Sequence, residues 1–372
     1  IFWIDRSKVK INNKGYSDFD HWSQTLLDQE ERELQNRKQY VNLEVSWANK
    51  GVKARVKRNT RRLDQARELK DNLERDITIF HAEIIKQLKI SDKTIIGLHG
   101  QTIYHNPDEK ISRQLGNGKL LNQLTNKDIV FNFRKNDILN EGQGAPLTPV
   151  FHHLISIINE IKLPVCFLNI GGISNITIIK DRENISELIS KDIGPGNCLI
   201  DAWVRKNSNK KFDEDGKLAL NGTKNEIIFE QAQELYANRN SKKKKSFDVN
   251  DFDISFVRGL SVSDGAATLT DFTASIIGEE LSLSLNKFTE KALDILICGG
   301  GRKNKILLKK IQQNMSPNFN FKLIDDYKIN GDFIESQAFA FLAIRSFRGL
   351  PISFPGTTGC KKACIGGELI KN

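Results

Sequence analysis

The stretch PVCFLNIGG, residues 164–172, runs from apolar, β-forming residues directly into a pair of glycines. The same pattern returns in ALDILICGGG, residues 292–301, and in TIIGLHG, residues 94–100. Short apolar runs of this kind are typical of strands that are buried on both faces, as in parallel sheets. The glycines after each run predict that these strand ends open onto a ligand.

Helical segments alternate with these runs, and the alternation predicts an α/β fold with a largely parallel or mixed sheet. The expected helices cover residues 149–161, 265–288, 303–313 and 335–347. The chain has 372 residues, which is enough for two domains. Its five cysteines show no CxxC pair and no zinc-ligand spacing, so we expect buried thiols in a reducing compartment. No apolar run is long enough to span a membrane.

Two glycine-rich turns are candidates for binding an anion. Gly171 and Gly172 lie between two β-branched runs, where a glycine pair permits a tight hairpin and a close approach of backbone N–H groups. Gly299 to Gly301 close the second run before a helical pattern, so backbone donors and a helix N-terminus can face a nucleotide. Glycine turns after strands are also common for purely steric reasons, and that alternative stays open.

Asp192 is the candidate catalytic carboxylate, because it precedes a rigid Gly-Pro-Gly turn. Pro195 stiffens this turn, while Gly194 and Gly196 leave room beside it. A carboxylate held in this way is well placed to act as a general base. The alternative is that Asp192 caps the following helix, a role that Asn197 can also fill.

Two further loops carry polar side chains that suit a polyhydroxyl ligand. LHGQTIYH, residues 98–105, contributes His99 and Gln101, and EGQGAPLTPVFHH, residues 141–153, contributes Gln143. Neither loop has the spacing of a nucleophile–histidine pair, and HExxH is absent, so we assign no metal ligand.

Residues 20–89 predict two long helices, because they contain no proline and one glycine, Gly51, near the expected break. The second helix carries an apolar stripe with spacings of three and four residues, which predicts a packing face. The stripe consists of Leu63, Ala66, Leu69, Leu73, Ile77, Phe80, Ile84 and Leu88. It keeps its phase across Asp76, so we expect one unbroken helix there. The basic run Lys50–Arg62 suggests either an RNA contact or a solvated helix face.

Seven segments, in sequence order, resemble the 1,6-anhydro-N-acetylmuramic acid kinases of bacterial cell-wall recycling. They are LHGQT, NFRKND with GQGAPLTP, LNIGGISNIT, DIGPGN with DAW, DGAATLTDFTA, ICGGGRKN and ESQAFAFLAIR. The resemblance covers about residues 77–372 and implies a two-lobed ATPase fold of the actin-like, sugar-kinase and Hsp70 type. Residues 77–164 would complete lobe I, residues 165–345 would form lobe II with the ATP motifs, and residues 346–372 would return toward lobe I.

The resemblance implies an enzyme that opens 1,6-anhydro-N-acetylmuramic acid with water and phosphorylates its O6 from ATP, with Mg²⁺. By motif match, Asp192 would activate the water. The expected ATP contacts are Gly171, Gly172, Gly299, Gly300 and Gly301. The expected substrate contacts are His99, Gln101, Gln143, Asn197 and Glu335. We expect a cytoplasmic protein whose partner is this small amino sugar, with a homodimer as an open alternative to a monomer.

The sequence departs from the family pattern at three places. These kinases begin with a strand, a GTSxDG phosphate loop and another strand, and residues 1–76 stand in that place here. The family's DFR is Asn132-Phe133-Arg134, and its DTGPGN is DIGPGN with Ile193. We therefore expect an incomplete first lobe and an impaired kinase.

Residues 1–76 resemble the end of the first nucleotide-binding domain and the following linker of F-type ATP-binding cassette proteins. FWIDRSKVKINN and VSWANKGVKARVKRNTRRLDQARELKDNLE carry this resemblance, which implies a mostly helical hairpin that contacts RNA. The chain is then expected to be a fusion of a linker remnant with a truncated kinase. The alternatives to a working kinase are an RNA- or ribosome-binding hairpin and an inactive gene-fusion remnant.

Overall fold

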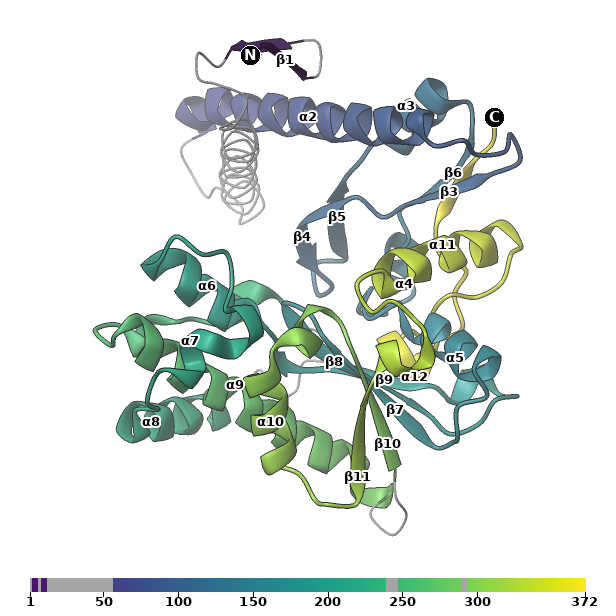
Figure 1. Cartoon of the computed structure of the whole chain (residues 1–372). Helices are drawn as coiled ribbons and strands as arrows, with labels where there is room; N and C mark the ends of the chain where they lie inside the picture. The colour runs from purple at the N-terminus through teal and green to yellow at the C-terminus, as the bar shows by residue number, and fades with distance from the viewer. Residues whose placement is uncertain (1, 6–7, 12–55, 239–246, 289–292) are drawn as a thin grey trace.

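The computed structural model describes residues 2–5, 8–11, 56–238, 247–288 and 293–372. These residues form two main sheets, each flanked by helices (Figure 1). The architecture confirms the expected α/β class, with mixed rather than purely parallel sheets.

The larger sheet has the strand order β11-β10-β7-β8-β9. Its strands are β7 (Val165–Ile170), β8 (Ile173–Ile179), β9 (Ile189–Pro195), β10 (Leu293–Cys298) and β11 (Phe319–Leu323). The strands β7, β8 and β9 form an antiparallel meander, and β10 and β11 add in parallel beside β7. The C-terminal ends of β7, β9 and β10 therefore share one edge of the sheet, where the glycine turns begin.

Helices cover both faces of the larger sheet, which explains why β7 and β10 are mostly apolar, each with a single polar residue, Asn169 and Asp294. On β7, Cys166, Leu168 and Ile170 face one core, while Val165 and Phe167 face the other. The first core is closed by α6 (Cys198–Asn207), α8 (Glu226–Ala237), α9 (Val262–Leu285) and α10 (Lys305–Gln313), beside the short α7 (Lys217–Leu220). The second core is closed by α5 (Pro149–Ile158) and α11 (Ile334–Phe347). The four helices expected along this part of the chain are confirmed.

The smaller sheet has the order β12-β6-β3, with β3 parallel and β12 antiparallel to β6. Its strands are β3 (Ile95–Leu98), β6 (Asp128–Phe131) and β12 (Glu368–Ile370). The hairpin of β4 (Gln101–Asn106) and β5 (Ile111–Leu115) follows β3, and α3 (Gly118–Thr125), α4 (Lys135–Leu139) and α12 (Pro355–Thr358) lie in the connections. Within the described residues β3 pairs with β6 alone, so the sheet ends at β3.

The helix α11 joins the two sheets. Ile334 and Ala338 pack in the second core of the larger sheet, while Phe339 and Ala343 pack with Val130 of β6. The start of α11 therefore lies at the junction of the two sheets, beside the glycine-rich strand ends.

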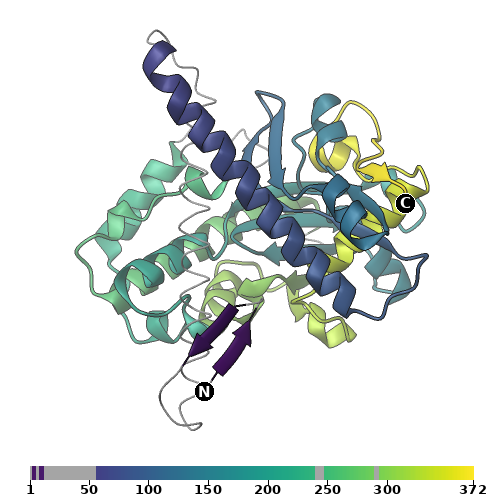
Figure 2. The same cartoon turned by 90° about the horizontal axis from the view of Figure 1, so that it is seen from above.

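The helix α2 (Val56–Gln87) runs without a break through Asp76, as its apolar phase predicts. It crosses over the rest of the described chain, and its N-terminal end projects beyond it (Figure 2). Leu73 and Ile77 are buried against the β4–β5 hairpin, but Phe80, Ile84 and Leu88 are 41–55% exposed. The predicted packing face is therefore only partly packed.

The first strands, β1 (Phe2–Asp5) and β2 (Lys8–Ile11), form a separate antiparallel hairpin. The expected first helix and the turn at Gly51 lie outside the described residues, as do all the Lys50–Arg62 side chains. Among the residues that the structure describes, every helix is too short or too polar to cross a membrane.

Candidate active site

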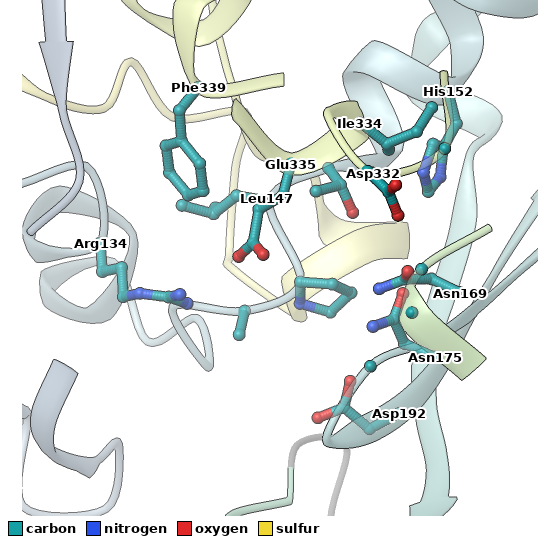
Figure 3. Close-up of a pocket in the computed structure, with 17 residues that line it drawn as sticks. Arg134, Leu147, His152, Asn169, Asn175, Asp192, Asp332, Ile334, Glu335 and Phe339 are labelled. Atoms are coloured by element: carbon teal, nitrogen blue, oxygen red, sulfur yellow. The ribbon is translucent and has the colours of Figure 1, made fainter. Parts of the chain in front are cut away.

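A cavity of about 320 Å³ lies where the glycine-rich edge of the larger sheet meets the start of α11 and the loop before α5 (Figure 3). Its polar lining includes three carboxylates, one guanidinium, two amides and one imidazole. These side chains belong to Asp192, Asp332, Glu335, Arg134, Asn169, Asn175 and His152. Arg134, Glu335 and Asp192 come from different segments, and their polar ends face the same space (Figure 3).

The three consecutive glycines after β10 have different physical roles. Gly299 has φ +80°, and a Cβ there would lie 2.5 Å from Oδ1 of Asn169. A Cβ on Gly301 would lie 2.2 Å from Cγ2 of Ile170. At Gly300, in contrast, the nearest atom to a Cβ is Nδ2 of Asn197 at 3.8 Å. Two of these glycines are therefore required for packing, and Gly300 is the one that leaves open space beside the cavity.

Gly171 and Gly172 form the β7–β8 turn, and a Cβ on either would make only ordinary contacts of 3.4 Å or more. Their carbonyl groups accept hydrogen bonds from the backbone of Gly196, Asn197 and Cys198. These bonds fix the turn against the N-terminus of α6. Gly171 lines the cavity together with Gly299 and Gly300, so the two turns border one space.

Asp192 lies within β9 and is 8% exposed. Its Oδ2 accepts a hydrogen bond of 2.8 Å from the Phe247 backbone N–H. Because Asp192 is a strand residue, it does not cap α6; Asn197 holds the N-cap position, without a side-chain capping bond. Gly194 and Gly196 are needed for close packing, since a Cβ would lie 2.6 Å from Ile276 and 2.2 Å from the Gly171 carbonyl oxygen, respectively.

Arg134 is held at the cavity wall by hydrogen bonds. Its Nη1 donates to the Gly144 carbonyl at 2.7 Å, and Nε and Nη2 lie 3.2 and 3.0 Å from Nε2 of His99. Burial lowers the pKa of Arg134, while the charges of Glu335 and Asp192 raise it. A guanidinium stays protonated in proteins, so the cavity wall carries a permanent positive charge that interacts with both carboxylates.

Asp332 and the Gly299–Gly301 turn are fixed by one buried arginine. Arg302 forms a two-bond contact with Asp325, at 2.7 and 3.2 Å, and donates to Asp332 at 2.9 Å and to the Gly299 carbonyl at 3.1 Å. Hydrogen bonds from Arg302 and Lys303 lower the pKa of Asp332 to about 2. Asp332 is therefore ionised at neutral pH.

The structure brings together five of the residues that the sequence indicated, because Asp192, Gly171, Gly299, Gly300 and Glu335 all line the cavity. The other indicated residues lie outside its lining. They are Gly172, Gly301, Asn197, His99, Gln101 and Gln143. Gln101 is exposed on β4, and Gln143 donates its backbone N–H to the Thr358 carbonyl. Sequence reasoning missed Arg134, Asn169, Asn175, His152 and Asp332. The NFR and LNIGG motifs already contained Arg134 and Asn169.

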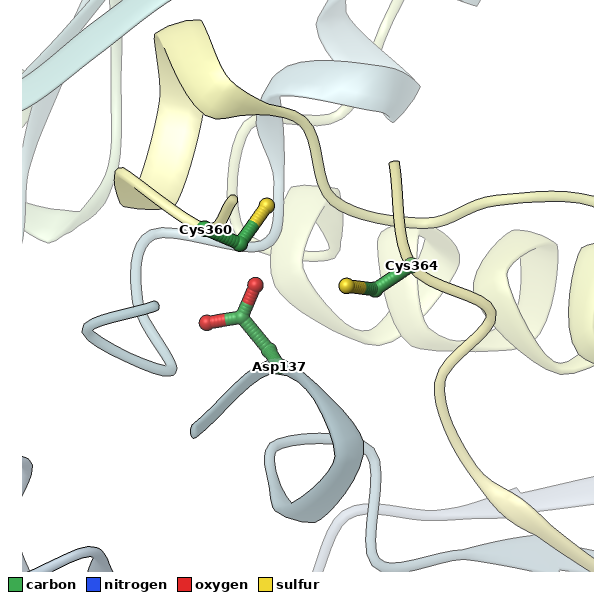
Figure 4. A group of neighbouring side chains, drawn as sticks. All are labelled: Asp137, Cys360 and Cys364. Atoms are coloured by element: carbon green, nitrogen blue, oxygen red, sulfur yellow. The ribbon is translucent and has the colours of Figure 1, made fainter. Parts of the chain in front are cut away.

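A second polar cluster lies around Asp137 (Figure 4). Its carboxylate accepts hydrogen bonds from the Ser353 and Thr358 hydroxyls at 2.5 and 2.6 Å, and from the Gly144 N–H at 2.6 Å. The Sγ atoms of Cys360 and Cys364 approach it. The carboxylate is occupied by protein donors, and burial raises the pKa of Cys364 to about 12, so the cluster fits a structural anchor better than a metal.

Two glycine turns and a fixed guanidinium border one cavity, and backbone N–H groups and guanidinium groups suit a phosphorylated ligand. A family model described as anhydro-N-acetylmuramic acid kinase matches residues 20–372. The chain belongs to this family. The match begins at residue 20, not near residue 77, so the comparisons do not support a cassette linker over residues 1–76.

Curated relatives agree with this assignment. The anhydro-N-acetylmuramic acid kinase of Pelagibacter ubique is 51% identical over 320 residues, which cover 84% of this chain and 85% of that protein. The enzyme of the same name from Agrobacterium fabrum is 35% identical and covers 80% of each chain. A solved activator of the 2-hydroxyisocaproyl-CoA dehydratase from Clostridium difficile, with bound ADPNP, covers 54% of this chain and 69% of its own. Its identity is 12% and its TM-score 0.33, too low to bear on the fold.

Proposed function

We propose that this chain uses ATP to convert 1,6-anhydro-N-acetylmuramic acid and water into N-acetylmuramic acid 6-phosphate. Family membership supports the reaction, and the observation that carries it is the position of Asp192. This buried carboxylate faces Arg134 and Glu335 across a cavity bordered by two glycine turns. The arrangement supplies a base, a fixed positive charge and room for phosphates in one place.

The glycine turns fit the phosphates of ATP. A side chain at Gly300 or Gly171 would occupy space that is open beside the cavity, so glycine keeps this space free for a ligand. The 3₁₀ turn Gly300–Lys303 and the helix α10 start here, and backbone N–H groups at such a start favour an anion. We therefore place the nucleotide phosphates beside Gly171 and Gly300.

The oxygen donors around the cavity suit Mg²⁺, which prefers carboxylate and amide oxygens together with substrate phosphates. Asp192, Asp332, Asn169 and Asn175 offer such atoms. When bound with ATP, Mg²⁺ would neutralise phosphate charge. We assign it to this wall of the cavity without choosing among the donors.

Asp192 would act as the general base. It would take a proton from a water molecule whose oxygen attacks C1 of the sugar. The C1–O6 bond then breaks, and O6 attacks the γ-phosphorus as ADP leaves. Arg134 carries a fixed positive charge near the carboxylates, which suits stabilisation of the negative charge that develops on O6 or on the transferred group. Glu335 would bind the sugar from the start of α11.

All side chains of Lys50–Arg62 lie outside the described residues, so the structure does not test the alternative of an RNA-binding hairpin. A homodimer and a cytoplasmic location stay predictions from the family resemblance.

The test uses the purified 372-residue chain with 1,6-anhydro-N-acetylmuramic acid, Mg-ATP and isotopically labelled water. Mass spectrometry should find N-acetylmuramic acid 6-phosphate that carries the label. Asp192→Asn should remove the activity. Asp201→Asn is the matched control, because Asp201 is a partly buried aspartate on α6 that does not line the cavity. Product formation that is unaffected in Asp192→Asn would contradict the assignment of the base. A folded wild-type chain that gives no product would reject the proposed function.

A further inference from the structure

His99 lies directly after β3 and contacts Arg134, which lines the cavity. It does not line the cavity itself. Its Nδ1 is 2.9 Å from the Gly100 carbonyl oxygen, and its Nε2 is 3.0 and 3.2 Å from two nitrogens of Arg134. Its ring lies against Phe339 of α11, with 4.1 Å between the ring centroids. The side chain is thus enclosed by Gly100, Arg134 and Phe339.

These contacts fix the tautomer of His99. A carbonyl oxygen only accepts hydrogen bonds, so Nδ1 must carry the proton that it donates to Gly100. A guanidinium only donates, so Nε2 must offer a lone pair to Arg134. The imidazole is therefore neutral and acts as an acceptor. Burial and the adjacent Arg134 charge agree with this state, because together they lower the pKa of His99 to about 3.

A second acceptor holds Arg134 from another side. The Gly144 carbonyl accepts from Nη1, and the Gly144 N–H donates to the buried carboxylate of Asp137. Gly144 has φ +68°, and a Cβ there would lie 2.9 Å from Ile138. The position of this carbonyl is therefore set by a tight, glycine-specific turn.

The two acceptors use three of the five N–H groups of the guanidinium: Nε–H, one on Nη2 and one on Nη1. One N–H group on each terminal nitrogen is left, and arginine uses such groups to bind the oxygens of phosphates and carboxylates. Arg134 lines the cavity, so these groups can reach a ligand there.

We propose that His99 is a positioning residue for the phosphoryl-transfer reaction: its neutral imidazole holds one edge of Arg134 so that the other edge binds an anionic group of the substrates. The proposal rests on the proposed kinase function. It replaces the direct substrate contact that the sequence suggested for His99. Lysine at position 134 would keep the charge but would lose the fixed pair of donors.

The test is a double-mutant cycle with His99→Leu, Arg134→Lys and the combined variant, measured as kcat and KM for both substrates. His99→Leu has no acceptor and should lower kcat by roughly 10- to 100-fold with little change in KM for ATP, because Arg134 is released from its orientation. His99→Gln keeps an acceptor oxygen and should recover much of the rate. In the Arg134→Lys background, His99→Leu should lower kcat by a much smaller factor, because His99 acts through Arg134.

Two results would overturn the proposal. One is an equal fold-loss of kcat from His99→Leu in the wild-type and Arg134→Lys backgrounds, since His99 would then act independently of Arg134. The other is a pH profile of kcat/KM that loses an ionisation near about pH 6–7 in His99→Gln, since His99 would then transfer protons itself. Thermal unfolding of each variant separates these effects from loss of the fold.

A readout without catalysis separates this proposal from the proposed function. NMR of the chain with labelled histidine ring nitrogens should show His99 as the Nδ1–H tautomer that does not titrate between about pH 5 and pH 8. In Arg134→Lys the Nε2 resonance should shift. If the wild-type chain makes no product but shows this signature, the kinase function fails and the His99–Arg134 contact stands. If His99 titrates with an ordinary pKa, the contact itself is refuted.

Discussion

Gly300 and Gly301 are adjacent, yet the structure predicts opposite consequences when each gains a side chain. A Cβ on Gly301 would lie 2.2 Å from Cγ2 and 2.7 Å from Cβ of Ile170, which is fully buried in β7. A Cβ on Gly300 meets no atom closer than 3.8 Å. Gly301→Ala should therefore damage the fold, and substitution of Gly300 should damage the ligand site.

The magnitudes follow from these distances. Overpacking of this kind costs about 1–3 kcal/mol, so Gly301→Ala should lower the free energy of unfolding by that amount. Gly300→Ala should be neutral or should stabilise the fold by up to about 1 kcal/mol, because alanine restricts the unfolded chain. Gly300→Val places further carbons in the open space and should weaken ATP-analogue binding at least about tenfold, or about 1.4 kcal/mol.

Urea unfolding without ligand measures the first effect, and calorimetric titration with a non-hydrolysable ATP analogue measures the second. A Gly301→Ala chain as stable as wild type would show that the turn does not pack on Ile170 as described. Unchanged affinity in a folded Gly300→Val chain would remove Gly300 from the nucleotide site. Each variant is the control for the other. Gly301→Ala tests stability, which Gly300→Val should leave intact, and Gly300→Val tests nucleotide binding.

Three further predictions concern stability and reactivity. Asp137→Ala should lower the free energy of unfolding in urea by about 3 kcal/mol or more, because two buried hydroxyls and the Gly144 N–H lose their acceptor. Asp137→Asn keeps one acceptor oxygen and should be less destabilised; a larger loss of unfolding free energy in Asp137→Asn than in Asp137→Ala would contradict this. Burial raises the pKa of Asp201 to about 6, so folding favours its protonated form and stability falls as pH rises from about 4 to about 6. Asp201→Asn should therefore stabilise the chain by about 1–3 kcal/mol at pH 8 and hardly at pH 4, and an equal effect at both would refute the shift. The five cysteines are buried and free, so a thiol reagent should label none in the native chain and all five in denaturant; rapid native labelling would contradict this burial.

The fold could be predicted from the sequence where one physical cause sets the pattern. The strands β7 and β10 are buried on both faces, so their sequences are mostly apolar. Close packing requires two of the glycines that follow β10, Gly299 and Gly301, whereas Gly171, Gly172 and Gly300 have room for a Cβ. The limits of α11 were predicted to within one residue, whereas α9 begins and ends three residues earlier than expected. The stripe on α2 was a weaker guide, because periodicity shows which side chains share a face but not whether another element covers it. Phe80, Ile84 and Leu88 lie on that face and are largely exposed.

The candidate site could be predicted only in part. Asp192 and the glycines stood out because rigid turns and strand ends are local features. The contact between His99 and Arg134 joins residues that are 35 positions apart, and it depends on how the segment after β3 meets the loop after β6. No local pattern shows such a contact. For the same reason His99 was expected to bind substrate, although it lies outside the cavity lining and contacts Arg134 instead.

The C-terminal segment belongs to the active site although it contributes no side chain to the cavity. Ser353 and Thr358 donate to Asp137, and the Thr358 carbonyl accepts the backbone N–H of Gln143. Asp137 in turn holds the N–H of Gly144, whose carbonyl fixes Arg134. The orientation of a cationic group in the cavity therefore depends on hydrogen bonds formed more than 200 residues later in the chain. A change in this segment should alter kcat before it alters the nucleotide-binding turns, because those turns are fixed separately by β7 and Arg302.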